Sequence, residues 1–309
     1  MLPAQAMVAA VVVTYRPDLP VLAELLAALS RQCQTVLVVD NASPAVTQAW
    51  LRQWQEEAPV GGGRLLLPQT SNLGVGAAQN LGIAQAAALG ACHVLLSDQD
   101  SLPAADMVAQ LLAASRAAGE GLALAAPVFV PLEQLAGTGG EACASAADGH
   151  FLACVEGRYR RVCCPADGVR EVDVAIASGS LIPLAVFDAI GRFDESLFID
   201  AVDTEWCLRA RTLGYRILAV GRARLGHRLG DACRRIWLPG GWRRVPIHAP
   251  QRTYTIARNN LRIGRYPHVS AAWRRYVRGM LLRRLGFFLL LGPQRLAHLT
   301  ALWRGWRDA

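Results

Sequence analysis

Two carboxylates one residue apart carry the strongest chemical signal in this sequence. Asp98 and Asp100 lie in the segment SDQDS, which directly follows the apolar run 93–96. In a turn, two carboxylates at this spacing can face one ribose or one hard cation, and Mg²⁺ prefers oxygen ligands while keeping water or phosphate in its other positions. Asp is also common in ordinary turns and helix caps, so the pair alone favours a structural role. Its position at the end of a buried strand favours a ligand site instead.

A second acid ends another apolar run. Asp40 and Asn41 follow residues 35–39, and Ser43 comes just before a proline. An Asp at a strand end can accept hydrogen bonds from a uracil or thymine N–H or from a ribose hydroxyl. The same residues can cap the step from a strand into a helix, and the two interpretations are compatible.

Two glycines one residue apart mark the third candidate segment. Gly74 and Gly76 follow Asn72 and precede an Ala-rich stretch that is typical of a helix. Glycines there let the backbone approach a ligand, and a helix N-terminus is a natural anion site. Because Gln79 takes the place of the last glycine of G-x-G-x-x-G, a nicotinamide-dinucleotide site is disfavoured. The sequence also has no Walker A pattern, which disfavours an ordinary P-loop ATPase.

Carboxylates are dense in residues 193–209, within an otherwise apolar frame. Helical spacing over 202–213 places Asp203 in the first turn, where a partly desolvated carboxylate can act as a general base. Acidic residues also favour helix N-termini for electrostatic reasons, which is the structural alternative. Glu205 and Arg209 are spaced i, i+4, so we expect them to pair and give Glu205 a mainly structural role.

Two further candidates lie later in the chain. His227 is flanked by Gly226 and follows a strand-like segment, so it is either a metal ligand or a structural residue. Arg258 falls close to the helical face of Arg252 and Tyr254. That face can meet a diphosphate or a sugar, and a solvated basic face is the alternative.

The elements that must position these candidates alternate between strand and helix over residues 7–130. Continuous apolar strands between helices predict an α/β fold with a mainly parallel sheet covered on both faces. Such sheets bind ligands at the carboxyl ends of their strands, so we expect Thr14, Asp40 and Asp98 to share one crevice. The expected strands are 7–14, 35–39, 64–67, 93–96 and 122–130, and the expected helices are 20–29, 46–57, 76–89 and 103–118.

The rest of the chain is less regular. Residues 131–150 are rich in Gly, Ala and Ser, which predicts a loop, and 172–182 resumes a strand pattern. From about residue 252 the chain is expected to be mostly helical and is rich in Arg.

Composition narrows the class of partner only in part. The chain has 309 residues, of which 53% are hydrophobic, and a net charge of +8 in which every basic residue is Arg. A basic balance suits nucleic acid, anionic lipid or a diphosphate. Because no recognised nucleic-acid module is present, we expect no nucleic-acid partner.

Cysteine usage and the lack of export signals predict a cytoplasmic protein. The eight Cys include no C-x-x-C pair, so we expect small core hydrophobes in a reducing compartment rather than a zinc or redox motif. The N-terminus lacks a basic region before its short apolar run, and no stretch has the length of a transmembrane helix. Peripheral contact with the inner face of the plasma membrane stays an open alternative.

Taken in order, the candidate segments resemble glycosyltransferase family 2, which has the GT-A fold, and most closely its rhamnosyltransferase-like members. Each segment is weak evidence by itself, whereas the ordered set is specific and covers residues from about 8 to 265. The segments are Val12–Tyr15, Val39–Ser43, Asn72–Gly74, Asp98–Ser101, Ala177–Ser180, Phe193–Glu195, Asp200–Trp206, His227–Gly230, Arg252, Tyr254 and Arg258–Asn260.

The resemblance implies an inverting single displacement on a nucleotide-diphospho-sugar. Asp203 would be the catalytic base, and Asp100 with His227 would hold Mg²⁺ or Mn²⁺ on the diphosphate through a DXD motif. Many relatives have Glu-Asp at the base motif, and here Val202 precedes Asp203, a departure that the rhamnosyltransferase-like members tolerate. The residues expected to contact the nucleotide or its diphosphate are Thr14, Tyr15, Asp40, Asn41, Asn72, Gly74, Asp98 and Arg258.

The function implied is transfer of a sugar, best matched by L-rhamnose from dTDP-rhamnose, to a hydroxyl of a glycan or lipid-linked glycan in bacterial surface polysaccharide synthesis. UDP-galactofuranose as donor is one alternative, and a non-catalytic module that binds a nucleotide-sugar or glycan is another. A nucleotidyltransferase is disfavoured because Tyr15–Asp18 after the first strand has no glycine.

We expect a GT-A domain over residues 1–265 and a helical, Arg-rich C-terminal extension over 266–309. The mixture of Arg with Leu, Phe and Trp in this extension is typical of a helix that lies in a membrane interface. Packing on the catalytic domain or on a second subunit of a homo-oligomer is the alternative, and the two are left open.

Overall fold

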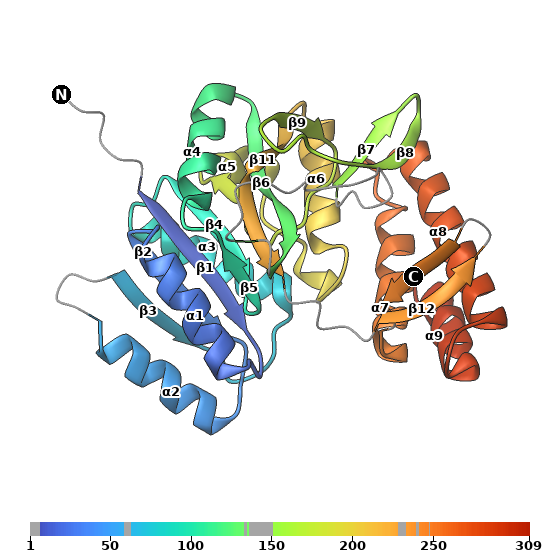
Figure 1. Ribbon diagram of the computed structural model, residues 1–309, viewed down its shortest axis with the longest axis horizontal. Helices are drawn as coiled ribbons and strands as arrows, with labels where there is room; N and C mark the ends of the chain where they lie inside the picture. The colour runs from blue at the N-terminus through green and yellow to red at the C-terminus, as the bar shows by residue number, and fades with distance from the viewer. Residues whose placement is uncertain are drawn as a thin grey trace. The chain divides into compact units, whose positions relative to one another are not determined.

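The computed structural model of the chain describes residues 7–58, 63–132, 135, 151–227, 233–238, 241–246 and 248–309. The chain divides into two compact units, Met1–Arg228 and Leu229–Ala309, which are described separately. Figure 1 shows the order of their helices and strands.

The first unit contains a nine-stranded sheet with the order β3-β2-β1-β4-β10-β6-β11-β5, in which β9 also pairs with β11. Its first four strands are parallel, as the apolar runs predict. The strands are β1 (Val8–Thr14), β2 (Thr35–Asp40), β3 (Gly63–Pro68), β4 (His93–Asp98), β5 (Ser101–Pro103), β6 (Leu122–Pro131), β9 (Val169–Val172), β10 (Leu181–Pro183) and β11 (Arg216–His227).

The remaining strands make the sheet more mixed than the sequence pattern indicates. β6 and β11 are parallel to each other, while β10, β5 and β9 pair antiparallel with their neighbours. A separate hairpin pairs β7 (Phe151–Val155) with β8 (Arg158–Val162). The antiparallel strands are short, and three-residue strands such as β5 and β10 leave too little periodicity to be found in the sequence.

Helices cover both faces of the sheet because successive side chains of a strand point to opposite faces. On one face, Val8, Ala10 and Val12 of β1 share a core cluster with leucines of α1 and α4. On the other, a Cβ added at Gly82 of α3 would collide with Val11, so glycine permits the close approach of this helix. The helices of this unit are α1 (Leu19–Ser30), α2 (Ala45–Glu56), α3 (Val75–Ala88), α4 (Met107–Ala118), α5 (Val186–Ile190), the short 3-10 turn η3 (Glu195–Leu197) and α6 (Val202–Thr212).

Two sequence predictions are wrong in this unit. Pro103 was expected near the first turn of a helix, but it ends β5, and α4 begins at Met107. The expected strand 172–182 is interrupted, because the chain leaves the sheet after Val172 and returns only at Leu181, across a turn in which Gly179 has φ +76°. The predicted loop 131–150 lies almost wholly outside the described residues.

The cysteines follow the sequence prediction only in part. Cys33, Cys164 and Cys207 are buried, and burial raises the pKa of the Cys33 thiol to about 12, as expected for an inert core thiol. Cys92 and Cys154 are exposed, and Cys163 is disulfide-bonded, so these three are not small core hydrophobes.

The second unit consists of a hairpin and three helices. The hairpin pairs β12 (Cys233–Leu238) with β13 (Gly241–Pro246), and the helices are α7 (Pro250–Ile263), α8 (Ala271–Leu290) and α9 (Arg295–Arg307). Pro250 lies in the first turn of α7, and Ser270 caps α8 by accepting a hydrogen bond from Trp273 N. Among the described residues, no helix is both long enough and apolar enough to cross a membrane.

Candidate active site

The ends of β1, β2 and β4 bring the first candidates together. In the parallel register Thr14 lies beside Asp40, and Val13 lies beside Asp98. Thr14 Oγ1 donates a hydrogen bond to Asp40 Oδ1 (3.1 Å), and Ser43 N donates to Asp40 Oδ2 (3.2 Å). Thr14 and Asp40 have no exposed surface. They therefore hold the strand ends together here, and their contact with a nucleotide stays a prediction.

Gln99, which the sequence pattern did not single out, ties the end of β1 to the turn that carries the two aspartates. Tyr15 N donates to Gln99 Oε1 (2.7 Å), and Gln99 Nε2 donates back to Tyr15 O (3.2 Å). The Tyr15 side chain stays exposed at this edge of the sheet, so it is available to a ligand. A reciprocal pair of this kind fixes the backbone of both segments.

Two asparagines shape the loop that precedes α3. Asn41 Nδ2 donates to Asn72 Oδ1 (2.9 Å), and Leu73 N donates to Asn41 Oδ1 (2.8 Å). Asn72 Oδ1 also accepts from Gly74 N (2.9 Å). The network fixes the loop that leads into α3 at the same edge of the sheet as Asp40.

A two-residue bridge joins the Asp98 turn to Asp203. Ser178 Oγ accepts a hydrogen bond from Asp98 N (3.0 Å) and lies 3.2 Å from Ser101 Oγ. Its neighbour Ala177 donates its backbone N–H to Asp203 Oδ2 (3.3 Å). Asp98 is thus held in one cluster with Ser178 and Asp203, which lie 80 and 105 positions later in the sequence.

Asp203 has the environment of a general base. It lies in the first turn of α6, and its Oδ1 accepts from Thr204 N (2.7 Å). Burial raises the pKa of its carboxyl above the ordinary value of 3.8, hydrogen bonds from Thr204 and Ala177 oppose this, and the nearby Asp200 charge adds to the rise. A carboxylate with a raised pKa holds a proton more strongly, which suits proton abstraction from a hydroxyl.

These shifts predict the pH dependence of activity. If Asp203 must be ionised, the rate rises with pH through the raised pKa and levels off above it. Asp200→Asn removes a charge that raises this pKa, so the rising part of the profile should move to lower pH. Asn tolerates the positive φ of 63° found at position 200, so the fold should be kept. Rate profiles of both proteins from pH 4 to 9 test this prediction, because the range begins near the ordinary Asp pKa of about 3.9 and extends well above it. An unmoved or upward-shifted profile would contradict it.

The segment before α6 is strained. Phe198, Asp200 and Ala201 have φ values of 62°, 63° and 62°, and Ile199 N donates to Leu197 O (2.7 Å), which closes a three-residue turn around Phe198. Positive φ costs a non-glycine residue about 1–3 kcal/mol and persists only where the surroundings enforce it. Here Val75 N, at the start of α3, donates to Phe198 O (2.7 Å).

The hydrogen bond between Val75 N and Phe198 O depends on Gly74, which has no side chain. This glycine has φ +85°, and a Cβ at this position would overlap the backbone and ring of Phe198. The loop that ends at Gly74 and the segment that leads to Asp203 are therefore packed directly on each other.

Gly74→Ala should therefore displace the Asp203 segment and lower turnover about tenfold to a hundredfold, as misplacement of a catalytic group does. Gly90→Ala is the matched control, because Gly90 also has positive φ (+77°) but a Cβ there would meet nothing within 4 Å. Both variants should lose about 1–2 kcal/mol of stability from the φ penalty. Equal turnover of the two, at equal melting temperature, would contradict this role for Gly74.

The Asp98 turn offers oxygen donors suited to a hard divalent cation. Asp100 is exposed and Asp98 is half-buried. In the β5–β11 register, His227 is paired with Ser101, so its backbone lies across from the residue after Asp100. The His227 side chain is outside the described part. Among the side chains that are described, no group of three or more His, Cys, Asp or Glu is arranged to hold a metal.

Two further candidate residues, Glu205 and Arg258, form contacts of their own. Glu205 forms the expected ion pair with Arg209 (2.8 Å), which also donates to the carbonyls of Ile190 and Arg192, so this pair is structural. Arg258 belongs to α7 of the second unit, where its Nε donates to Asn259 Oδ1 (2.9 Å). Its contact with a diphosphate stays a prediction.

Comparison with known proteins identifies the class. Two solved structures share the fold: S. aureus TarS 1-349 in complex with UDP-GlcNAc (TM-score 0.58, 16% identity, 97% of this chain and 80% of that chain), and GalNAc-T7 with UDP, GalNAc and Mn²⁺ (TM-score 0.57, 14% identity, 90% of this chain and 55% of that chain). The fold is GT-A, and the protein is a glycosyltransferase.

A sequence match agrees with this class. Residues 9–139 match the model for glycosyl transferase family 2. Over 273 residues the chain is 29% identical to dTDP-rhamnosyl transferase RfbF of Shigella flexneri, with 84% of this chain and 80% of that protein covered. The resemblance seen in the ordered motifs is thereby confirmed.

Proposed function

We propose that this glycosyltransferase moves L-rhamnose from dTDP-rhamnose to a hydroxyl of a glycan or lipid-linked glycan in bacterial surface polysaccharide synthesis, with inversion at the anomeric carbon. The observation that carries the proposal is the Ala177–Ser178 bridge, which holds Asp203 beside the Asp98 turn. The likeness to a dTDP-rhamnosyl transferase supports the choice of donor.

Asp203 performs the proton transfer in this mechanism. Its carboxylate takes the proton of the acceptor hydroxyl while that oxygen forms a bond to the anomeric carbon. The bond between the anomeric carbon and the diphosphate oxygen breaks in the same displacement, and the nucleoside diphosphate leaves with the electron pair. Attack from the side opposite to the leaving group inverts the configuration.

Asp100 would hold Mg²⁺ or Mn²⁺, with His227 as a further ligand, and Asp98 would contact the nucleotide. When bound, the cation supplies charge neutralisation for the departing diphosphate. Carboxylate oxygens one residue apart fit such a cation, and the presence of Mn²⁺ in the GalNAc-T7 structure supports its use. Tyr15, which is exposed at the same edge of the sheet, would contact the nucleoside, and the loop before α3 would contact the diphosphate.

A GT-A module that binds a nucleotide-sugar without catalysis is the alternative, as is transfer from UDP-galactofuranose. The position of the half-buried Asp203 carboxyl, which is linked through Ala177 and Ser178 to the Asp98 turn and has a raised pKa, favours an enzyme, because acids with this combination cluster at catalytic sites.

Release of nucleoside diphosphate by the purified protein tests the proposal. The donors are dTDP-rhamnose, UDP-glucose, UDP-galactose and UDP-galactofuranose, each with Mg²⁺ and bacterial lipid extract as acceptor source. We expect release from dTDP-rhamnose alone. Release from UDP-galactofuranose instead would replace the donor, and tight nucleotide binding without release from any donor would favour the binding module.

A further inference from the structure

The two units differ sharply in charge. Residues 229–309 contain 16 Arg and two acidic residues, a formal charge of +14, whereas residues 1–228 contain 16 Arg and 22 acidic residues, a formal charge of −6. The net positive charge of the chain therefore comes entirely from the second unit. A charge of this density attracts an anionic surface over about a Debye length, near 8 Å at physiological salt.

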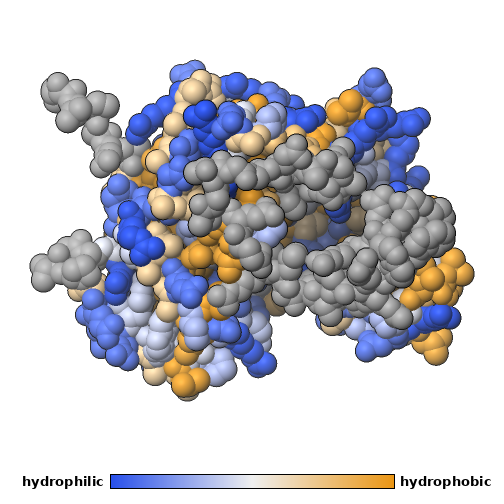
Figure 2. All heavy atoms as spheres, viewed as in Figure 1, coloured by the Kyte–Doolittle hydropathy of each residue, from blue (hydrophilic) through white to orange (hydrophobic). Residues whose placement is uncertain are grey.

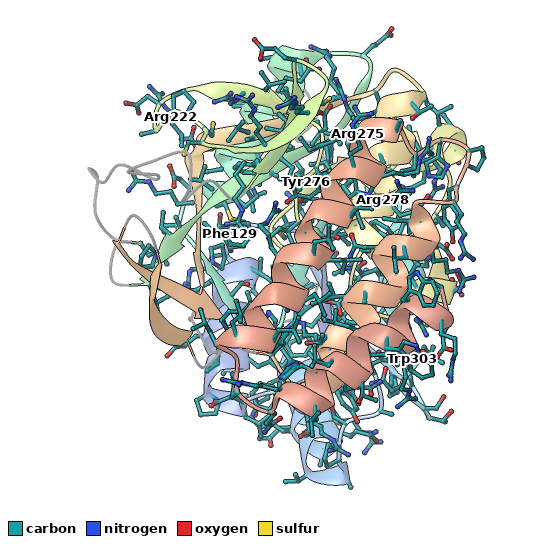
Figure 3. The ribbon with its side chains drawn as sticks, turned by 90° about the vertical axis from the view of Figure 1, so that its right-hand side faces the viewer. Phe129, Arg222, Arg275, Tyr276, Arg278 and Trp303 are labelled. Atoms are coloured by element: carbon teal, nitrogen blue, oxygen red, sulfur yellow. The ribbon has the colours of Figure 1, made fainter. Side chains whose placement is uncertain are left out.

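One face of α8 combines arginines with exposed leucines. Arg275, Arg278, Leu282, Leu285 and Leu289 follow one another at steps of three or four residues, so they lie on one side of the helix. Figure 3 shows Arg275 and Arg278 on the earlier turns of α8. The three leucines are 67%, 37% and 50% exposed. The face is basic along its first half and apolar along its second.

The apolar surface continues around the turn into α9. Leu290, Leu291 and Leu296 are 71%, 40% and 82% exposed. Together with Leu282, Leu285 and Leu289 they form what we call the leucine corner. Arg295 lies at this corner, because its Nη2 donates to Leu290 O (3.0 Å). In Figure 2, apolar side chains gather on this unit near the lower right of the view.

Two tryptophans extend the surface along α9. Trp303 comes two turns after Leu296 on the same side of the helix and is 56% exposed, and Trp306 is 66% exposed. The Arg307 guanidinium carbon lies 5.1 Å from the Trp303 ring centre. Arg beside Trp is typical of helices that lie at a membrane interface, where the indole sits at headgroup level.

These side chains are not an unfilled part of the core, because the opposite faces of the same helices are already packed. Phe288 of α8 stacks on His298 of α9 with ring centres 3.8 Å apart, and His298 Nδ1 lies 3.0 Å from Thr253 Oγ1 of α7. Phe288 and His298 are buried. The helices thus hold one another in place and present the leucine corner outward.

We propose that the leucine corner and the adjoining Arg and Trp side chains bind an anionic lipid surface. The leucines enter the boundary between headgroups and acyl chains, and Arg278 and Arg295 meet the phosphates. A second copy fits less well, because two units of +14 would repel each other across this face. Such a surface would keep the enzyme where a lipid-linked acceptor lies.

Vesicle flotation of the full chain tests the proposal. The vesicles are phosphatidylcholine alone or phosphatidylcholine with about 30% phosphatidylglycerol, which carries the negative charge of a bacterial inner leaflet. We expect the wild type to float with the anionic vesicles, at least about tenfold more than with the neutral ones, and to be released by about 1 M salt, where the Debye length falls to about 3 Å.

The variant Leu282→Gln/Leu289→Gln/Leu290→Gln should bind the anionic vesicles at least about tenfold more weakly, since it removes three of the exposed leucines of the leucine corner. The matched control, Val46→Gln/Leu89→Gln/Leu213→Gln, changes three exposed apolar residues of the first unit and should bind as the wild type does. Equal circular dichroism and melting temperature show that each variant is folded.

Flotation that is absent in the wild type, equal with neutral vesicles or unchanged in the leucine variant would overturn the proposal. So would a wild-type dimer in sedimentation equilibrium that the leucine variant converts to a monomer, because the corner would then be a subunit interface. None of these measurements depends on transferase activity, so their failure leaves the proposed reaction untouched.

Discussion

Asp203→Asn should lower the rate of sugar transfer by about 10²–10⁴-fold, the usual contribution of a general base. The amide cannot accept the proton of the acceptor hydroxyl, and little else changes. Asn is nearly isosteric with Asp, and its oxygen can still accept a hydrogen bond from Thr204 N, the shorter of the two backbone contacts (2.7 Å against 3.3 Å from Ala177 N). Donor affinity should change by less than about tenfold, since the lost interaction belongs to the transition state.

The measurement is nucleoside-diphosphate release together with donor binding by calorimetry. Asp188→Asn is the matched control, because Asp188 is an exposed acid on α5 and should keep full activity. Transfer at the wild-type rate by Asp203→Asn would remove Asp203 as the base. A loss of donor binding as large as the loss of rate would give it a binding role instead.

Asp100→Ala should lower the rate by about a hundredfold or more, through loss of the divalent cation. Removal of one group that stabilises transition-state charge typically costs about 10²–10³-fold. Asp100 is exposed at the edge of the sheet, and no hydrogen bond or ion pair with another described residue engages its carboxylate. The substitution should therefore leave the fold intact.

Titration with Mg²⁺ and Mn²⁺ separates this role from a structural one. The wild type should lose activity in EDTA and regain it with either cation, whereas Asp100→Ala should need far more cation for half its residual rate. Asp188→Ala serves as the control and should titrate as the wild type does. Wild-type activity that persists in EDTA would contradict a metal at this turn.

The parallel half of the sheet was predictable because its strands are continuous apolar runs. Each of β1, β2 and β4 is closed by a polar residue, and parallel strands with buried faces place those residues at one edge. The closeness of Thr14, Asp40 and Asp98 at the strand ends follows from that pattern, and the Glu205–Arg209 pair follows from helical spacing. That the three line one ligand crevice stays a prediction.

The contacts that assemble the site were not predictable in the same way. Ser178 lies 80 residues from Asp98, and no local pattern indicates that its hydroxyl accepts from the Asp98 N–H. The positive φ of Phe198 goes against the preference of a bulky residue and is enforced by the distant Gly74 and Val75. Both features come from tertiary packing, which a pattern of neighbouring residues does not contain.

The reaction product tests the central claim most directly. Purified protein is incubated with dTDP-rhamnose, Mg²⁺ and bacterial lipid extract, and both the nucleotide product and the acceptor mass are measured. Our account predicts dTDP as the nucleotide product and a gain of one deoxyhexose by a lipid-linked acceptor, both lost in Asp203→Asn. Pyrophosphate as the product, or bound donor with no change in acceptor mass, would contradict it.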